Sequence, residues 1–132
     1  MNNSLLFLLE IDPVTGNFLK YHLNSNGFWN VMLFPNQGEC LYSLQRNIIP
    51  DFIITDTSMM GMPDLQFLKS IKADHPAITV IFFSENEDVS HISALLDAGA
   101  TDYILRVGDK QNWIHELISN LQYLIKEEIR FQ

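Results

Sequence analysis

Five short apolar runs constrain the fold of this chain more than any other feature of its sequence. Each run is rich in aliphatic and aromatic residues and lacks the regular polar alternation of a strand with one face in water. This pattern predicts strands that are buried on both faces, which are typical of parallel sheets. The runs are Leu5–Leu9, Trp29–Phe34, Phe52–Ile54, Thr79–Phe83 and Tyr103–Leu105.

The longer segments between these runs have the sequence signals of helices. Asp12, Asp88 and Asp109 are predicted N-caps, and Pro13 and Pro63 stand where a first helical turn accepts proline. The apolar faces expected to point inward are, in chain order, Val14, Phe18 and Tyr21; Leu41 and Leu44 within Asn36–Arg46; Leu65, Leu68 and Ile71; Val89, Ile92, Leu95 and Leu96; and Trp113, Leu117, Leu121 and Leu124. Strand followed by helix, repeated five times, predicts a doubly wound parallel α/β sheet with helices on both faces.

Composition limits the function classes that suit this chain. Its 132 residues suffice for one domain, and its formal charge of −8 opposes direct binding to nucleic acid or to an anionic membrane surface. A single cysteine, Cys40, excludes an internal disulfide and fits a reducing cytoplasm. No apolar run approaches the roughly 20 residues of a membrane helix.

Four polar residues follow predicted strands at their carboxyl ends. Glu10 follows the first strand, Asp56 the third, Ser84 the fourth and Arg106 the fifth. Doubly wound sheets bind ligands at this edge, so the four side chains are expected to converge there. Two neighbouring carboxylates are typical ligands of Mg²⁺. An aspartate that lies beside cations and a hydroxyl is a plausible acceptor in phosphoryl transfer. Taken singly, Asp56 and Ser84 are more often turn residues, and Arg106 is more often a surface ion pair; their convergence favours a functional site.

Three segments together resemble the receiver domains of bacterial response regulators. The run Pro50–Met62 is similar to their phospho-acceptor segment, in which an aspartate ends a buried strand and a methionine follows three residues later. Ile78–Ser84 resembles their fourth strand, which ends in a hydroxyl residue. Ala98–Arg106 resembles their segment of Ala-Gly-Ala, Asp-Tyr and a basic residue. Each motif alone is weak, but the ordered set covers nearly the whole chain.

The resemblance implies a fold, a mechanism and a set of site residues. The fold would be flavodoxin-like with strand order 2-1-3-4-5, and residues 1–132 would form one receiver domain without enzymatic activity of its own. A sensor histidine kinase would phosphorylate Asp56, and Ser84, Tyr103 and Arg106 would respond to the phosphoryl group. Mg²⁺ would be held by Glu10, Asp56 and the backbone carbonyl of Ser58, with Asp12 as an alternative ligand.

The family also implies how the signal leaves the domain. Partners, a downstream output domain or a second copy would dock on the face made by the fourth helix, the fifth strand and the fifth helix. The polar end of the chain, residues 126–132, suits either a terminus or a linker to a further domain.

Several residues depart from the family pattern. Ile11 stands where the family has a second acid that binds the metal, which predicts weak Mg²⁺ binding. Arg106 replaces a lysine, and Glu85 replaces a small residue at the pocket mouth. Two hypotheses follow: a phosphorylated receiver, which the retained charges favour, or a pseudo-receiver that acts through protein contacts without phosphorylation.

Other function classes have weaker support. Thr15-Gly16-Asn17 is a faint match to a flavin phosphate loop, which makes a small flavin-binding protein a remote alternative. A hydrolase would need a nucleophile motif and a histidine partner for Ser84, and the sequence has neither. The four histidines are expected in helices or a loop and exposed to solvent, and they lack zinc-ligand spacing.

Overall fold

Strands and helices alternate along the whole described chain. The computed structural model describes residues 2–57 and 59–130, in which a five-stranded parallel sheet has the order β2-β1-β3-β4-β5. The strands are β1 (Asn2–Leu9), β2 (Phe28–Phe34), β3 (Phe52–Asp56), β4 (Thr79–Ser84) and β5 (Asp102–Leu105). The helices are α1 (Pro13–Ser25), α2 (Gln37–Gln45), α3 (Asp64–Asp74), α4 (Val89–Asp97) and α5 (Lys110–Arg130). The predicted fold and strand order are therefore confirmed.

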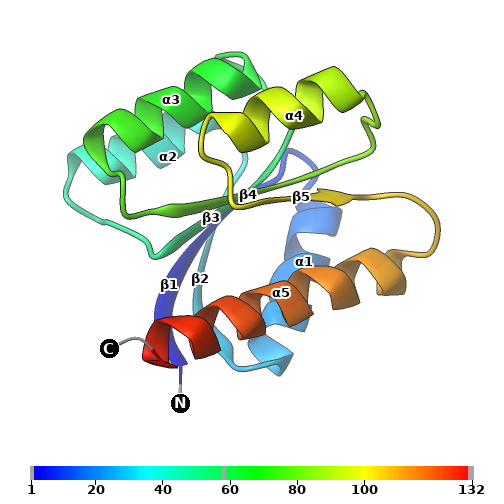
Figure 1. Ribbon diagram of the computed structural model, residues 1–132. Helices are drawn as coiled ribbons and strands as arrows, with labels where there is room; N and C mark the ends of the chain where they lie inside the picture. Colours follow the sequence, from blue (N-terminus) through cyan, green and yellow to red (C-terminus); the bar gives the residue numbers. More distant parts are fainter. Residues whose placement is uncertain (1, 58, 131–132) are drawn as a thin grey trace.

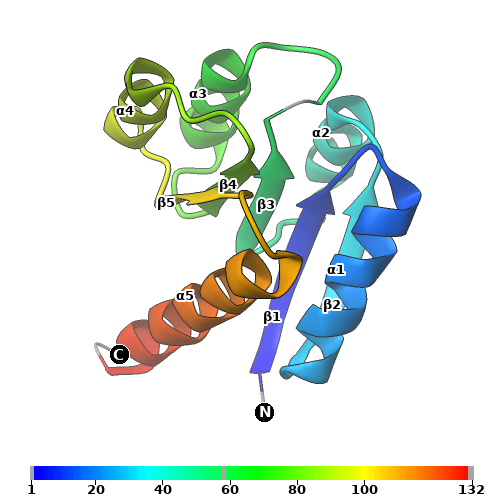
Figure 2. The same ribbon diagram turned by 90° about the vertical axis from the view of Figure 1, so that its right-hand side faces the viewer.

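The helices lie in two layers on opposite faces of the sheet. In Figures 1 and 2, α1 and α5 cover one face and α2, α3 and α4 cover the other. Because side chains alternate across a strand, neighbouring residues of β3 enter different layers: Ile54 packs with the side of α1 and α5, and Ile53 with the side of α2–α4. Both isoleucines are fully buried, as the unbroken apolar runs predicted.

The predicted helix starts agree with the structure. The Asp12 and Asp88 side chains accept hydrogen bonds from the backbone N–H groups of Val14 and Ser90, and so cap α1 and α4. Pro63 directly precedes α3, and the Asp109 carboxylate accepts from the Gln111 N–H at the start of α5. No helix in these described segments is long and apolar enough to cross a bilayer.

The predicted inward face of α1 is wrong. Val14 and Tyr21 are 75% and 66% exposed, and the buried residues are instead Gly16, Leu19 and Leu23. The helix turns this face inward because it approaches β2 closely at Gly16, where an added Cβ would lie 2.9 Å from a Leu33 methyl carbon. Gly16 permits this close approach, and Leu19 and Leu23 are the large apolar residues that α1 buries on the same side.

The predicted inward face of α4 is also only partly correct. Leu95 is buried and Ile92 half-buried, whereas Val89 and Leu96 are exposed. Because α4 contacts the rest of the protein through only a narrow stripe of residues, the apolar residues on either side of that stripe remain in water. The surface of α4 is therefore more apolar than the sequence pattern suggested.

Candidate functional site

Parallel strands deliver the predicted site residues to one edge of the sheet. Asp56 is the last residue of β3 and pairs in register with Phe83, while Ser84 ends β4 and pairs with Leu105. Arg106 continues the ladder beyond β5, because its N–H donates to the Ser84 carbonyl at 2.7 Å. The Glu10 N–H likewise donates to the carbonyl of Phe34 at the end of β2.

An arginine lies between two buried carboxylates at this edge. One guanidinium nitrogen of Arg106 (Nη2) is 3.2 Å from Asp56 Oδ2, and the other (Nη1) is 3.4 Å from Glu10 Oε2. Asp56 is 2% exposed and Glu10 is 4% exposed. Buried carboxylates are costly without a counter-charge, and the forked guanidinium shares its single positive charge between the two.

Burial makes Glu10 easier to protonate than an ordinary glutamate. Burial raises the pKa of Glu10 to about 7, and the hydrogen bond to Asp56 and the negative charge of Asp56 raise it further. The positive charge of Arg106 lowers the pKa of Glu10 in part. The two carboxyl groups therefore share both a hydrogen bond and a cation.

Hydroxyl groups form the second side of the site. The hydroxyls of Ser84 and Thr57 are hydrogen-bonded to each other, and Ser84 Oγ accepts from the Asn86 N–H at 2.9 Å. The Tyr103 hydroxyl donates to the Asn86 carbonyl at 2.8 Å. Burial raises the pKa of Tyr103, so its hydroxyl keeps its proton and remains a donor.

A histidine links two helices beside this network. His91 Nε2 of α4 is 3.1 Å from Asp64 Oδ2 of α3, and the His91 ring meets the Tyr103 ring edge to face at 6.4 Å. Burial raises the pKa of Asp64, although the His91 charge lowers it in part. The expectation that all histidines are exposed to solvent is therefore wrong for His91, which is half-buried and paired.

Sequence reasoning missed a glutamine that holds the loop after Asp56. The buried amide of Gln37 donates to the Met62 carbonyl at 3.1 Å and accepts from the Met62 N–H at 2.7 Å. Gly61 has a φ of +124°, and an added Cβ there would lie 2.5 Å from the Gln37 oxygen. No local pattern in the sequence marks Gln37, because its partner lies 25 residues away.

The remaining predicted metal ligands do not join the carboxylate pair. The Asp12 carboxylate accepts from the Val14 N–H and from the Thr15 hydroxyl, at 3.2 and 2.7 Å, as the N-cap of α1. Ile11 is 47% exposed and has no ligand atom in its side chain. Ser58 lies outside the described residues. In the two described stretches, no group of three or more His, Cys, Asp or Glu side chains is placed to hold a metal ion.

A cavity of about 280 Å³ opens beside Glu10 and Arg106 at this edge. Its lining includes Glu10, Arg106 and Trp113, with Glu85 and Lys110 nearer to solvent. Because this cavity lies at the carboxyl ends of the strands, it is where ligands of doubly wound sheets bind. Glu85 brings a negative charge to its mouth, as the sequence suggested.

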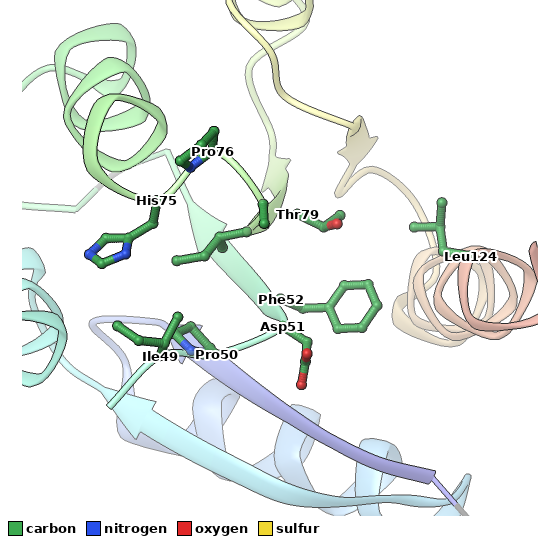
Figure 3. Close-up of a pocket in the computed structure, with 10 residues that line it drawn as sticks. Ile49, Pro50, Asp51, Phe52, His75, Pro76, Thr79 and Leu124 are labelled. Carbon is green, nitrogen blue, oxygen red and sulfur yellow. The ribbon is translucent and has the colours of Figure 1, made fainter. Parts of the chain in front are cut away.

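A larger cavity, of about 410 Å³, lies at the opposite edge of the sheet. Figure 3 shows it between the amino ends of β3 and β4, with Pro50 and Pro76 on its walls and Leu124 of α5 facing it. Its one carboxylate, Asp51, already accepts from the Leu5 N–H at 2.8 Å. This edge lacks the convergent charges of the other, so the candidate site is the Glu10–Asp56–Arg106 edge.

The faint flavin-loop motif does not form a loop. Thr15, Gly16 and Asn17 all lie within α1, where Gly16 is buried against β2. Their backbone N–H groups are consequently part of a helix and do not form a phosphate-binding turn. This removes the sequence feature on which the flavin alternative depended.

The statistical model of the response regulator receiver domain family matches residues 6–118. The chain belongs to this family. Receiver domains are signalling modules of two-component systems, they typically have no enzymatic activity, and they generally bind Mg²⁺ at the phosphorylation site. Response regulators work with histidine kinases and output domains.

Individual relatives agree with this assignment. The chain is 28% identical over 99 residues to a cyclic di-GMP phosphodiesterase of Thermotoga maritima, a match that covers 75% of this chain and 26% of that protein. It is 35% identical over 71 residues to the DNA-binding transcriptional regulator NtrC of Escherichia coli, covering 54% of this chain and 15% of NtrC. This receiver thus corresponds to a small part of each of these relatives.

A solved structure shows the same fold at low sequence identity. The receiver domain of Francisella response regulator 1452 superimposes with a TM-score of 0.82 at 22% identity, covering 96% of this chain and 99% of that one. The likeness therefore spans the sheet and both helical layers.

Proposed function

We propose that this receiver accepts a phosphoryl group on Asp56 from a phosphohistidine of a sensor histidine kinase. The observation that carries the proposal is the Asp56 carboxylate itself, which is buried at the end of the central strand and paired with Arg106 at 3.2 Å. A carboxylate held in a site that already contains a cation is suited to a transfer that adds negative charge.

The proposed transfer is a direct displacement. A carboxylate oxygen of Asp56 bonds to phosphorus while the bond from phosphorus to the histidine nitrogen breaks, and the imidazole leaves with the bonding electrons. Arg106 stabilises the charge on the phosphoryl oxygens, and the Thr57 and Ser84 hydroxyls, which lie at the ends of β3 and β4, are the proposed donors to them.

The test is the intact mass of the protein after incubation with acetyl phosphate, with Mg²⁺ and separately with EDTA. We expect one phosphoryl adduct in the wild-type protein and none in Asp56→Asn, because the amide is not a nucleophile of comparable strength. An adduct of equal yield in Asp56→Asn would place the modification elsewhere and contradict the proposal.

We also propose that phosphorylation is read on the face of α4, β5 and α5. Support comes from the chain of contacts that leads there from the site: Ser84 to Asn86, Asn86 to the Tyr103 hydroxyl, and the Tyr103 ring to His91 of α4. A population shift in this network would change the surface offered to an output domain or to a second copy. A monomeric mass in light scattering, both with and without acetyl phosphate, would count against dimerisation.

A pseudo-receiver is the second candidate, favoured by a specific contact. Arg106 already pairs with both carboxylates, and Ile11 supplies no additional ligand. In that case the domain signals by binding protein partners in the unmodified state. The absence of an adduct under all acetyl phosphate conditions is the result that would favour this candidate.

A further inference from the structure

The charge of Arg106 is fixed in place from two directions. On one side its guanidinium meets Asp56 and Glu10, and on the other its central carbon is 5.5 Å from the Phe83 ring centroid and 5.9 Å from that of Trp113. The two rings are stacked, with centroids 6.0 Å apart and planes 8° from parallel. Aromatic faces attract a guanidinium, so this cation is held at the carboxylates and not free to withdraw into water.

A divalent ion that bound both carboxylates would compete for the same oxygens. Mg²⁺ requires oxygen ligands at about 2.1 Å in near-octahedral geometry, commonly one or two carboxylates with waters. Here one oxygen of each carboxylate faces the guanidinium, and a bound dication would lie beside a fixed positive charge. Ile11 has no ligand atom in its side chain, and the Asp12 carboxylate, which lines the same cavity as Glu10 and Arg106, already accepts hydrogen bonds from the Val14 N–H and the Thr15 hydroxyl as the cap of α1. These residues do not fit a resident divalent metal.

We infer that Arg106 is the resident cation of this site and that it takes the place of the divalent metal ion. The Glu10–Asp56 pair then has its cation from the protein itself, and binding of Mg²⁺ or Mn²⁺ to it is excluded. The part of this inference that concerns phosphorylation rests on the proposed function: a phosphoryl group on Asp56 is stabilised by the guanidinium and forms without a metal.

Mn²⁺ binding measures the first part directly. Electron paramagnetic resonance counts free Mn²⁺ during a titration, and Asp56→Asn identifies ions bound at the site as opposed to elsewhere on the acidic surface. We expect wild-type protein and Asp56→Asn to bind Mn²⁺ equally. One additional Mn²⁺ in the wild-type protein that Asp56→Asn loses would overturn the inference, and this comparison needs no variant at position 106.

Two matched substitutions test whether Arg106 is the cause. Arg106→Met removes the charge but keeps an unbranched side chain, and we expect it to gain one Mn²⁺ with an affinity at least about tenfold above any that the wild-type protein shows at this site. Lys110→Met removes a cation from the lining of the same cavity, where the ammonium lies over the Phe18 ring at 5.8 Å, and should leave Mn²⁺ binding unchanged.

Each outcome of these titrations decides the inference. Unchanged Mn²⁺ affinity in Arg106→Met would overturn it, as would an equal gain in Lys110→Met. Arg106→Gln replaces Arg106→Met if the latter lacks the wild-type circular dichroism spectrum. The inference is supported if Arg106→Met gains Mn²⁺ affinity and the double variant Arg106→Met/Asp56→Asn loses that gain.

The acetyl phosphate experiment separates this inference from the proposed function. An adduct on Asp56 that forms equally in EDTA and in Mg²⁺ supports both. An adduct that requires Mg²⁺ supports the proposed function and overturns the inference. If no adduct forms in either condition, the proposed function fails and the Mn²⁺ titrations alone decide the role of Arg106.

Discussion

Buried polar side chains are concentrated at the carboxyl edge of the sheet. Glu10, Thr55, Asp56 and Ser84 are all at most 4% exposed, although they adjoin a core that is otherwise apolar. Within residues 3–57 and 59–127, every buried side-chain nitrogen and oxygen has a hydrogen-bond partner. Burying polar groups in this way is costly unless they are paired. A cluster of buried, paired polar side chains at one edge of the sheet therefore indicates a functional site.

Cys40 is a buried titratable residue with no part in this site. Its thiol on α2 is fully buried among apolar neighbours, and burial raises the pKa of Cys40 to about 12. In the unfolded chain the thiol ionises near its ordinary pKa of 9.0, so above that pH only the unfolded state loses this proton. The folded state then binds more protons, and the free energy of unfolding falls as pH rises.

We therefore expect Cys40→Ala to remove part of the alkaline loss of stability. Between pH 8 and pH 10 the thiol lowers the wild-type free energy of unfolding by about 1 kcal/mol, so the stability gap between wild type and Cys40→Ala should narrow by that amount. Urea titrations at both pH values measure the gap. A gap that stays constant or widens would contradict the buried, protonated state of this thiol.

At the scale of the element, strands were easier to predict than helix faces. A strand buried on both sides needs only an unbroken apolar run, and each predicted run lies within an observed strand. The face of a helix depends on which side comes closest to its neighbour. In α1 that side carries Gly16, Leu19 and Leu23, and Gly16 lies against Leu33 of β2, a contact that periodicity cannot reveal.

Two substitutions in α1 test its observed orientation. Leu19 is 1% exposed, so Leu19→Ala should lower the free energy of unfolding by about 3 kcal/mol through lost burial and the cavity it leaves. Tyr21 is 66% exposed, so Tyr21→Ala should change it by at most about 0.5 kcal/mol. Urea denaturation followed by circular dichroism compares the two. If Tyr21→Ala lowered the free energy of unfolding more than Leu19→Ala did, the result would contradict the observed orientation and favour the inward face that the sequence pattern predicted.

The site shows the same division between what local sequence reveals and what it does not. Glu10, Asp56, Ser84 and Arg106 were predictable because the ends of parallel strands meet at one edge. Their pairing was not, since the sequence does not specify that Arg106 bridges both carboxylates. Gln37–Met62 and Asp64–His91 also join residues remote in the chain, and only the folded arrangement of α2, α3 and α4 brings them together.

For the whole molecule, the sheet lies between two cores, one on each of its faces, and its strands contribute residues to both. Consecutive residues of β3 enter opposite layers, so loosening one layer displaces a strand that the other layer also needs. A domain of this size is expected to unfold in a single cooperative step. The site lies at the end of that same strand, which means that the rigidity of both layers positions Asp56.

Ile53 and Ile54 offer a matched test of this coupling. Both are fully buried, on opposite faces, so Ile53→Val and Ile54→Val should each lower the free energy of unfolding by about 1 kcal/mol. In a Trp29→Phe background, which removes a 60% exposed indole, fluorescence reports Trp113 in the layer of Ile54. For both variants the urea midpoint from fluorescence should equal that from far-ultraviolet circular dichroism. If Ile53→Val shifted the dichroism midpoint and left the Trp113 midpoint in place, the layers would unfold separately, and Asp56 would be held chiefly by the layer that persists.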